Sequence, residues 1–338
     1  MTDGTEPYAH AARSVKARID MSIVKKDFKA LSSDGIHTLS GAVYAPDQGE
    51  VMGFFHVVHG MTEHIARYER FMSDMAEAGW ICFGYDNLGH GRTAENDAEL
   101  GYIAKTDGWD ILAKDVKAFS DAVFAEYGVS ADGVSGRAPY VLMGHSMGSF
   151  IARLAAQKYV RADRLVIMGT GGKNGAANAG LAVIALIKLF FGDKHISPFV
   201  DKLAFGSYNS RFTAELGAAP SPWLTNDIDV RKRYSEDKYC SFKFTVSAMG
   251  DLIRLTKYSN STQWYKSLPR EMPVLLVSGE EDPVGNYGKG VCEVRDGLAE
   301  QGIDVKCILY KGARHEILND FTYDRVKEDI LDFCGGRE

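Results

Sequence analysis

The sequence lacks an apolar segment long enough to cross a lipid bilayer. Its longest apolar run, residues 181–191, is interrupted by Lys188, whereas a membrane-spanning helix needs about 20 apolar residues. The first part of the chain alternates charged and small residues without a continuous apolar core, so we expect no standard secretory signal. A hydrophobic content of 45% and a charged content of 25% are ordinary for a globular protein.

Cysteine pairs, basic stripes and nucleotide-binding motifs are also missing. The five cysteines are odd in number, scattered and without a Cys-x-x-Cys pair, which predicts reduced thiols and a cytoplasmic location. The net charge is −6 and no basic stripe occurs, so a nucleic-acid partner is not expected. The glycine-rich residues 169–174 match neither a phosphate-binding loop nor a dinucleotide-binding motif.

Histidines gather in residues 56–64 without forming a known metal-binding pattern. His56, His59 and His64 lie around a predicted strand end, and the spacing is not that of His-Glu-x-x-His on a helix. We therefore expect no metal and no other cofactor.

Strand-like and helix-like patterns alternate along most of the 338 residues. Residues 23–44, broken by a turn cluster at residues 32–35, predict an antiparallel hairpin. The apolar runs that follow alternate with helical patterns and predict a mostly parallel sheet with helices on both faces. The alternation stops between residues 171 and 268, which we call the insert. The predicted parts are an N-terminal tail or surface helix (1–22), an α/β core (23–170 and 269–338) and a mainly helical insert (171–268).

A Gly-x-Ser-x-Gly pattern, Gly144-His145-Ser146-Met147-Gly148, lies between a predicted strand and a predicted helix. In a chain with 35 glycines the five residues alone are a weak signal, but the strand before them and the helix after them make it specific. The sharp turn requires nearly side-chain-free flanking positions, which glycine provides. This context predicts that Ser146 is a nucleophile.

A nucleophilic serine needs a base, and the base needs an acid that orients it. His315 follows the last predicted strand, and Asp282 follows the preceding one. The order serine, aspartate, histidine is the one that α/β-hydrolases use. Glu280 and Glu281 compete with Asp282 for the acid role.

Two backbone amides are candidates for the oxyanion hole. One belongs to Met147, directly after the serine, and the other to Met61, after an earlier predicted strand. Gly60 lets the chain approach the substrate carbonyl, and we expect Gly60, His145 and the two glycines of the serine turn to shape the site. All these groups follow strand ends, where functional residues of such sheets collect.

Five motifs together resemble the monoacylglycerol lipase and lysophospholipase family of α/β-hydrolases. They are residues 59–64 (HGMTEH), 86–91 (DNLGHG), 144–148 (GHSMG), 282–284 (DPV) and 315–319 (HEILN). The resemblance extends from about residue 25 to the C-terminus and is weakest in the insert. It implies an eight-stranded hydrolase fold with the insert as a cap, and hydrolysis of carboxylic esters. It also implies a triad of Ser146, Asp282 and His315 and an oxyanion hole at Met61 and Met147. Asp86 and His90 fit the family's Asp-x-x-Gly-His-Gly loop, and we favour a structural role for them, fixing a turn beside the site, over direct catalysis.

We therefore expect a serine hydrolase whose substrate is a small-molecule or lipid ester, cleaved through an acyl-enzyme. A proline-releasing aminopeptidase is an alternative, which needs carboxylates in the insert to bind a free α-ammonium group. Its candidates are Glu215, Asp227, Asp229, Glu236 and Asp237. A non-catalytic ligand-binding member of the fold is a third hypothesis. The pattern does not predict an oligomeric state.

Two features of the insert have two interpretations each. The apolar run at residues 181–191 either packs on the core or forms an exposed entrance that touches lipid aggregates. The aromatic residues of the insert either form its own core or line a tunnel for an acyl chain.

Overall fold

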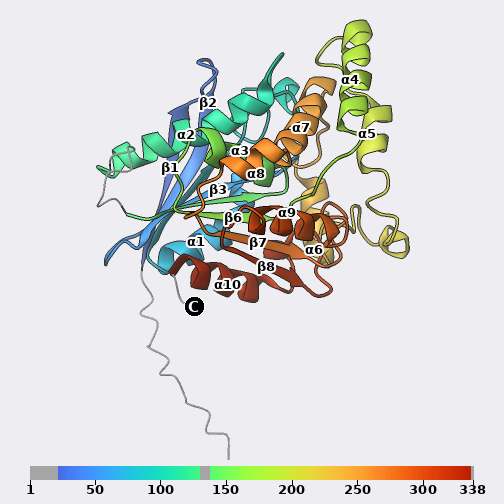
Figure 1. The fold of residues 1–338 in the computed structure, drawn as a ribbon. Coiled ribbons are helices and arrows are strands. Elements are labelled where there is room, and N and C mark those ends of the chain that lie inside the picture. The colour runs from blue at the N-terminus through green and yellow to red at the C-terminus, as the bar shows by residue number, and fades with distance from the viewer. Residues whose placement is uncertain (1–21, 130–137, 336–338) are drawn as a thin grey trace, which may run out of the picture.

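The computed structural model describes residues 22–129 and 138–335, so all but the last residue of the predicted tail (1–22) lies outside the described residues. Eight strands form one sheet in the spatial order β1-β2-β4-β3-β5-β6-β7-β8 (Figure 1). The strands are β1 (Ile23–Leu31), β2 (Thr38–Pro46), β3 (Gly53–Val58), β4 (Trp80–Tyr85), β5 (Tyr140–His145), β6 (Arg164–Met168), β7 (Val274–Gly279) and β8 (Val305–Tyr310).

In the spatial order given above, all strands from β4 to β8 are parallel to their neighbours in this range. β1 and β2 form the predicted antiparallel hairpin, and β2 also pairs antiparallel with β4. The pairs β4–β3, β3–β5, β5–β6, β6–β7 and β7–β8 are all parallel. This confirms the predicted mostly parallel eight-stranded sheet. It also brings the carboxyl ends of β3, β5, β7 and β8 to one edge.

Helices cover both faces of the sheet (Figure 1). α1 (Glu69–Glu77) and α10 (Tyr323–Gly335) cover one face. α2 (Gly108–Glu126), α3 (Met147–Lys158) and α9 (Lys289–Ala299) cover the other. Alternate residues of one strand therefore enter two different cores, as Phe54 and Phe55 of β3 do. Burial on both faces explains why the central strands have continuous apolar sequences.

The insert forms five helices between β6 and β7. They are α4 (Ala177–Phe191), α5 (Pro198–Phe205), α6 (Ile228–Glu236), α7 (Val246–Ser259) and α8 (Thr262–Ser267). Four 3-10 turns complete the described elements, at Ile65–Tyr68, Asp97–Glu99, Thr213–Glu215 and Ile317–Asn319. α7 packs on α2, α3 and α4, and the indole of Trp264 in α8 donates to the carbonyl of Arg153 in α3 at 2.8 Å. These last two helices of the insert therefore join the helical layer of the core, and the division at residue 268 stays a prediction.

α4 projects from the molecule beside α5 (Figure 1). Its Ile184 is buried against Gly250 of α7, whereas Leu189 and Phe190 are 77% and 71% exposed. The run at residues 181–191 thus packs with one face and is exposed on the other. In the part of the chain that the structure describes, no helix combines the length and the apolar character needed to cross a membrane.

Candidate active site

Ser146 occupies a strained turn between β5 and α3. Its backbone has φ 55° and ψ −122°, a conformation that non-glycine residues rarely adopt. A Cβ on Gly144 would lie 2.1 Å from the carbonyl oxygen of Gly148, and a Cβ on Gly148 would lie 2.1 Å from that of Val58. Both flanking positions therefore require glycine, and the turn presents Ser146 at the N-terminus of a 12-residue helix.

Asp282 and His315 meet at the carboxyl ends of β7 and β8. The Nδ1 of His315 lies 2.9 Å from Oδ2 of Asp282, and both residues are buried. Asp282 is itself held by the amide of Val284, which donates to Oδ1 at 2.8 Å. Glu280 and Glu281 are exposed instead. A donor at Nδ1 leaves Nε2 as the basic nitrogen of the ring, the arrangement that a general base needs.

One cavity of about 760 Å³ brings the remaining predicted groups together. Ser146, His315, Met61 and Met147 all line it. A Cβ on Gly60 would lie 2.9 Å from the Cβ of Ser146, so this loop passes directly beside the serine. The two residues whose amides are candidates for the oxyanion hole thus line the same cavity as the candidate nucleophile and base.

Part of the cavity wall comes from aromatic residues of the insert. The centroid of the Trp223 ring lies 5.1 Å from that of the His315 ring, and both residues line the cavity. Other aromatics of the insert, Phe212 and Phe244, are buried elsewhere. The insert aromatics that line the cavity are Phe205, Tyr208, Trp223, Tyr234 and Phe242. The insert aromatics therefore divide between residues that line the cavity and residues that are buried away from it, and a tunnel for an acyl chain stays a prediction.

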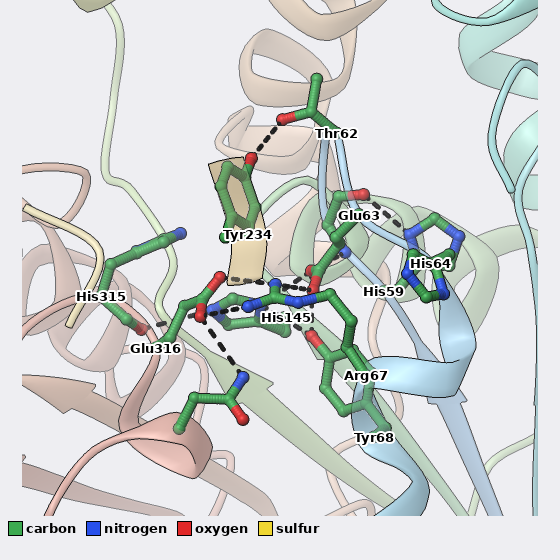
Figure 2. Close-up of polar contacts among 12 residues, drawn as sticks. His59, Thr62, Glu63, His64, Arg67, Tyr68, His145, Tyr234, His315 and Glu316 are labelled. Atoms are coloured by element: carbon green, nitrogen blue, oxygen red, sulfur yellow. Dashed lines mark hydrogen bonds and ion pairs between the residues drawn. The ribbon is translucent and has the colours of Figure 1, made fainter. Parts of the chain in front are cut away.

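Glu63, which itself lines the cavity, is the centre of a polar network (Figure 2). Its Oε1 accepts from the amide of Gly60 at 2.5 Å and from the hydroxyl of Tyr68 at 3.0 Å, and lies 3.1 Å from Nδ1 of His145. Its Oε2 accepts from Arg67 at 3.0 Å. One carboxylate therefore holds the Gly60 turn, the residue before the candidate nucleophile and the start of the next helix.

Arg67 extends the network to the loop of the candidate base. Its guanidinium donates two parallel bonds of 2.6 Å to Glu316, the residue after His315. Figure 2 shows Arg67 between Glu316 and Glu63. Burial opposes the charge of Arg67, but the two carboxylates outweigh it and raise its pKa. Planar, bidentate geometry of this kind is the strongest form of ion pair.

His145 links the network to the candidate base. Its Nε2 lies 3.3 Å from the carbonyl oxygen of His315. Burial disfavours the charged ring, but the hydrogen bond and the charge of Glu63 outweigh it and raise the pKa of His145. Burial alone would raise the pKa of Glu63, but the hydrogen bond and the charge of His145 outweigh burial and lower this pKa. His145 therefore has an acceptor near each ring nitrogen and joins Glu63 to the backbone of the candidate base, and its role in shaping the site stays a prediction.

Four residues of this network, Glu63, Arg67, Tyr68 and Glu316, were not predicted from the sequence. Two signals were available, because Glu63 lies within the 59–64 motif and Glu316 follows the candidate base directly. The partners could not be assigned, since Arg67 and Glu316 are 249 positions apart.

Asp86 and His90 fix the chain beside the cavity. Asp86 accepts from the amides of Ile65 and Arg92, both at 2.7 Å. His90 lies 3.0 Å from the carbonyl oxygen of Leu88 through Nδ1. These contacts with backbone groups fit the structural role that we favour for both residues over direct catalysis.

The histidines set aside as metal ligands have other partners. Nδ1 of His56 lies 3.0 Å from the hydroxyl of Tyr140, and Nδ1 of His59 lies 2.8 Å from the carbonyl oxygen of Gly60. Burial lowers the pKa of both rings to about 3. Among the described residues, His64, Asp237 and Cys240 bring three ligand-type atoms within 4.8 Å. His64 and Asp237 are already hydrogen-bonded to each other at 2.9 Å.

The sheet order, the two helical layers and the serine turn define an α/β-hydrolase fold. A family model described as "Serine aminopeptidase, S33", of the Hydrolase_4 family, matches residues 49–322. The chain therefore belongs to this hydrolase family.

Known proteins of similar sequence and structure agree with this assignment. A monoacylglycerol lipase of Mycolicibacterium smegmatis is 22% identical over 85% of this chain and 89% of its own length. A monoglyceride lipase homolog of Monkeypox virus is 29% identical over 81% of this chain and 85% of its own. The structure of a thermostable carboxyl esterase from Bacillus coagulans superposes with a TM-score of 0.84 and 27% identity, covering 93% of this chain and 98% of the other. The resemblance predicted from the five motifs is confirmed.

Proposed function

We propose that the chain is a serine hydrolase that cleaves carboxylic esters of single-chain lipids, of the monoacylglycerol or lysophospholipid type. One observation carries the proposal: Ser146 and His315 line the same cavity, while Asp282 holds Nδ1 of His315 at 2.9 Å. The lipase and esterase names of the similar proteins support the ester chemistry.

In the proposed mechanism Ser146 Oγ attacks the ester carbonyl while Nε2 of His315 accepts its proton. The amides of Met61 and Met147 stabilise the oxyanion of the tetrahedral intermediate. The intermediate collapses to an acyl-enzyme, and the alcohol leaves with the proton from His315. Water, deprotonated by the same nitrogen, then hydrolyses the acyl-enzyme and regenerates Ser146.

The cavity supports a substrate with one apolar chain and a polar head. Its wall includes apolar side chains, among them Phe205 and Leu252, and also Lys173, Asn174 and Lys289. We propose that the insert is a cap over this cavity and that the exposed face of α4 makes transient contact with membranes or micelles. A cytoplasmic location is also proposed, from cysteines that are all free thiols.

The aminopeptidase alternative has less support, because none of its five candidate carboxylates lines the cavity, and Asp201, an insert carboxylate that does, is paired with Lys243 at 3.1 Å. Glu215 pairs with Arg314 and Arg231, Asp227 caps α6, and Asp237 bonds to His64. The non-catalytic alternative is disfavoured by the hydrogen-bonded Asp282 and His315 beside Ser146.

A panel of monoacyl esters of graded chain length, compared with aminoacyl anilides, tests the proposal. We expect hydrolysis of the esters with a preference for long acyl chains, and a loss of about 10⁴–10⁶ in kcat for Ser146→Ala. Preferred cleavage of the anilides would favour the aminopeptidase alternative. Near-full turnover by Ser146→Ala would refute the mechanism.

A further inference from the structure

The loop that carries Met61 is held from two sides. Its residue Glu63 points into the core, where it binds the buried network. Its residues Thr62 and His64 reach the insert. The hydroxyl of Thr62 lies 2.8 Å from that of Tyr234 in α6, and Nε2 of His64 lies 2.9 Å from Oδ2 of Asp237, directly after α6. Figure 2 shows Thr62 and Tyr234 directed toward each other.

Thr62 has an unusual backbone that needs outside support. Its φ is 51°, which lies in the left-handed region that β-branched residues avoid. Such a conformation persists only when surrounding contacts impose it. The contacts are the Tyr234 hydroxyl on its side chain and Nε2 of His90, 3.3 Å from its amide. Because Thr62 follows Met61 directly, these contacts hold the peptide unit adjacent to the one that carries the Met61 amide.

Tyr234 and Asp237 are themselves well anchored. The ring of Tyr234 lies 4.9 Å from the guanidinium carbon of Arg67, which the network fixes. The second carboxylate oxygen of Asp237 accepts from the amide of Tyr239 at 2.8 Å. The two side chains can therefore transmit the position of the insert to the loop.

We propose that Tyr234 and Asp237 are positioning residues for the Met61 amide, so that the docked insert sets part of the oxyanion hole. This inference rests on the proposed function, because it needs that amide to stabilise an oxyanion. Neither residue has to touch the reacting atoms. Tyr234 acts through Thr62 and Asp237 acts through His64, the two residues that flank Glu63 in the sequence.

The chain offers a matched control at a second junction. The hydroxyl of Tyr102, in the core, donates to Asp193 of the insert at 2.9 Å. This bond involves the same two residue types, tyrosine and aspartate, and also joins core and insert, but neither residue is among those that line the cavity. Tyr102→Phe and Asp193→Asn therefore measure the general cost of weakening the junction.

The experiment measures kcat and KM of the full chain on a short-chain p-nitrophenyl ester. It also measures Ki for an alkyl trifluoromethyl ketone, whose serine adduct places an oxyanion in the hole. We expect Tyr234→Phe and Asp237→Asn to lower kcat by about 3- to 10-fold and to raise Ki by a similar factor, as expected for one net hydrogen bond. KM should change by less than about twofold, because substrate binding does not use the amide until charge develops.

A double-mutant cycle distinguishes loss of the Thr62–Tyr234 contact from a general loss of stability. Thr62→Val removes the other half of the hydroxyl pair, so Thr62→Val with Tyr234→Phe should lose no more activity than either single change. The inference is overturned if Tyr234→Phe and Asp237→Asn match their controls in kcat and Ki, or if the Thr62 and Tyr234 effects simply add. A wild-type chain that hydrolyses no ester would instead refute the proposed function.

Discussion

Replacing Glu63 with glutamine removes one negative charge from the centre of the buried network. Its side chain is 4% exposed and is close to four donors: the amide of Gly60, the hydroxyl of Tyr68, Nδ1 of His145 and the guanidinium of Arg67. Glutamine has the same shape but offers one acceptor atom in place of two. At least one of the four partners therefore faces an NH₂ group instead of an oxygen.

The expected stability loss follows from this count. Removing one partner of a buried ion pair costs about 3–5 kcal/mol of stability. Because Arg67 is still paired with Glu316 in the variant, we expect a loss near the lower end of this range. With an unfolding entropy of roughly 2.1 cal/mol/K per residue, a chain of 338 residues should lose about 4–7 °C in Tm. The Gly60 turn also loses its anchor, so we expect kcat to fall by about 10- to 100-fold, below the 10²–10³ seen when an oxyanion donor is lost outright.

Scanning calorimetry and ester kinetics at neutral pH measure both effects. Glu69→Gln is the matched control, because Glu69 pairs with Lys25 at 2.8 Å but both side chains are about half exposed. An exposed pair of this kind contributes only about 0–1 kcal/mol, so its Tm and kcat should hardly change. A Glu63→Gln variant with wild-type kcat would refute the claim that this carboxylate positions the Gly60 turn.

Three further predictions concern the same site. Asp282→Asn should lower kcat by about 10⁴ with little change in KM, because the wrong histidine tautomer is then favoured; steady-state kinetics check this, and a loss below tenfold would contradict it. Gly148→Ala should abolish soluble expression or activity, because its Cβ would lie 2.1 Å from a backbone carbonyl, whereas Gly217→Ala meets nothing within 4 Å and should be neutral. The raised pKa of His145 means that its charge stabilises the fold below about pH 6.5 and that this contribution is lost as the pH rises through the higher folded pKa. The Tm of the wild type should therefore fall more between pH 6.5 and 9 than the Tm of His145→Gln. An equal fall in Tm for both proteins would contradict a raised pKa of His145.

Periodicity and chain order predicted much of the fold, since the core has simple local patterns. The apolar runs of the central strands identify a sheet that is buried on both faces, and the rule that functional residues follow strand ends predicts that Asp282 lies near His315, as the structure shows. Their catalytic roles stay predictions. The start of the helix after β3 was less predictable, because residues 65–68 form a 3-10 turn before α1 begins at Glu69.

Long-range polar pairing could not be predicted from the sequence. A charged residue in a polar loop has no local pattern that reveals a partner such as Glu316 for Arg67. The packing partners of the insert could not be predicted either. The helical period of α7 indicates an apolar face, but it does not indicate which element packs against that face. Contacts between the insert and the core, such as Thr62 with Tyr234, depend on the tertiary arrangement of both.

The most direct test of the proposed mechanism is covalent labelling of the full chain with a fluorophosphonate, followed by intact-mass and peptide mass spectrometry. The mechanism predicts one adduct per chain, on Ser146, formed far more slowly in His315→Ala and not at all in Ser146→Ala. The absence of an adduct, or an adduct on another residue that persists in Ser146→Ala, would contradict it.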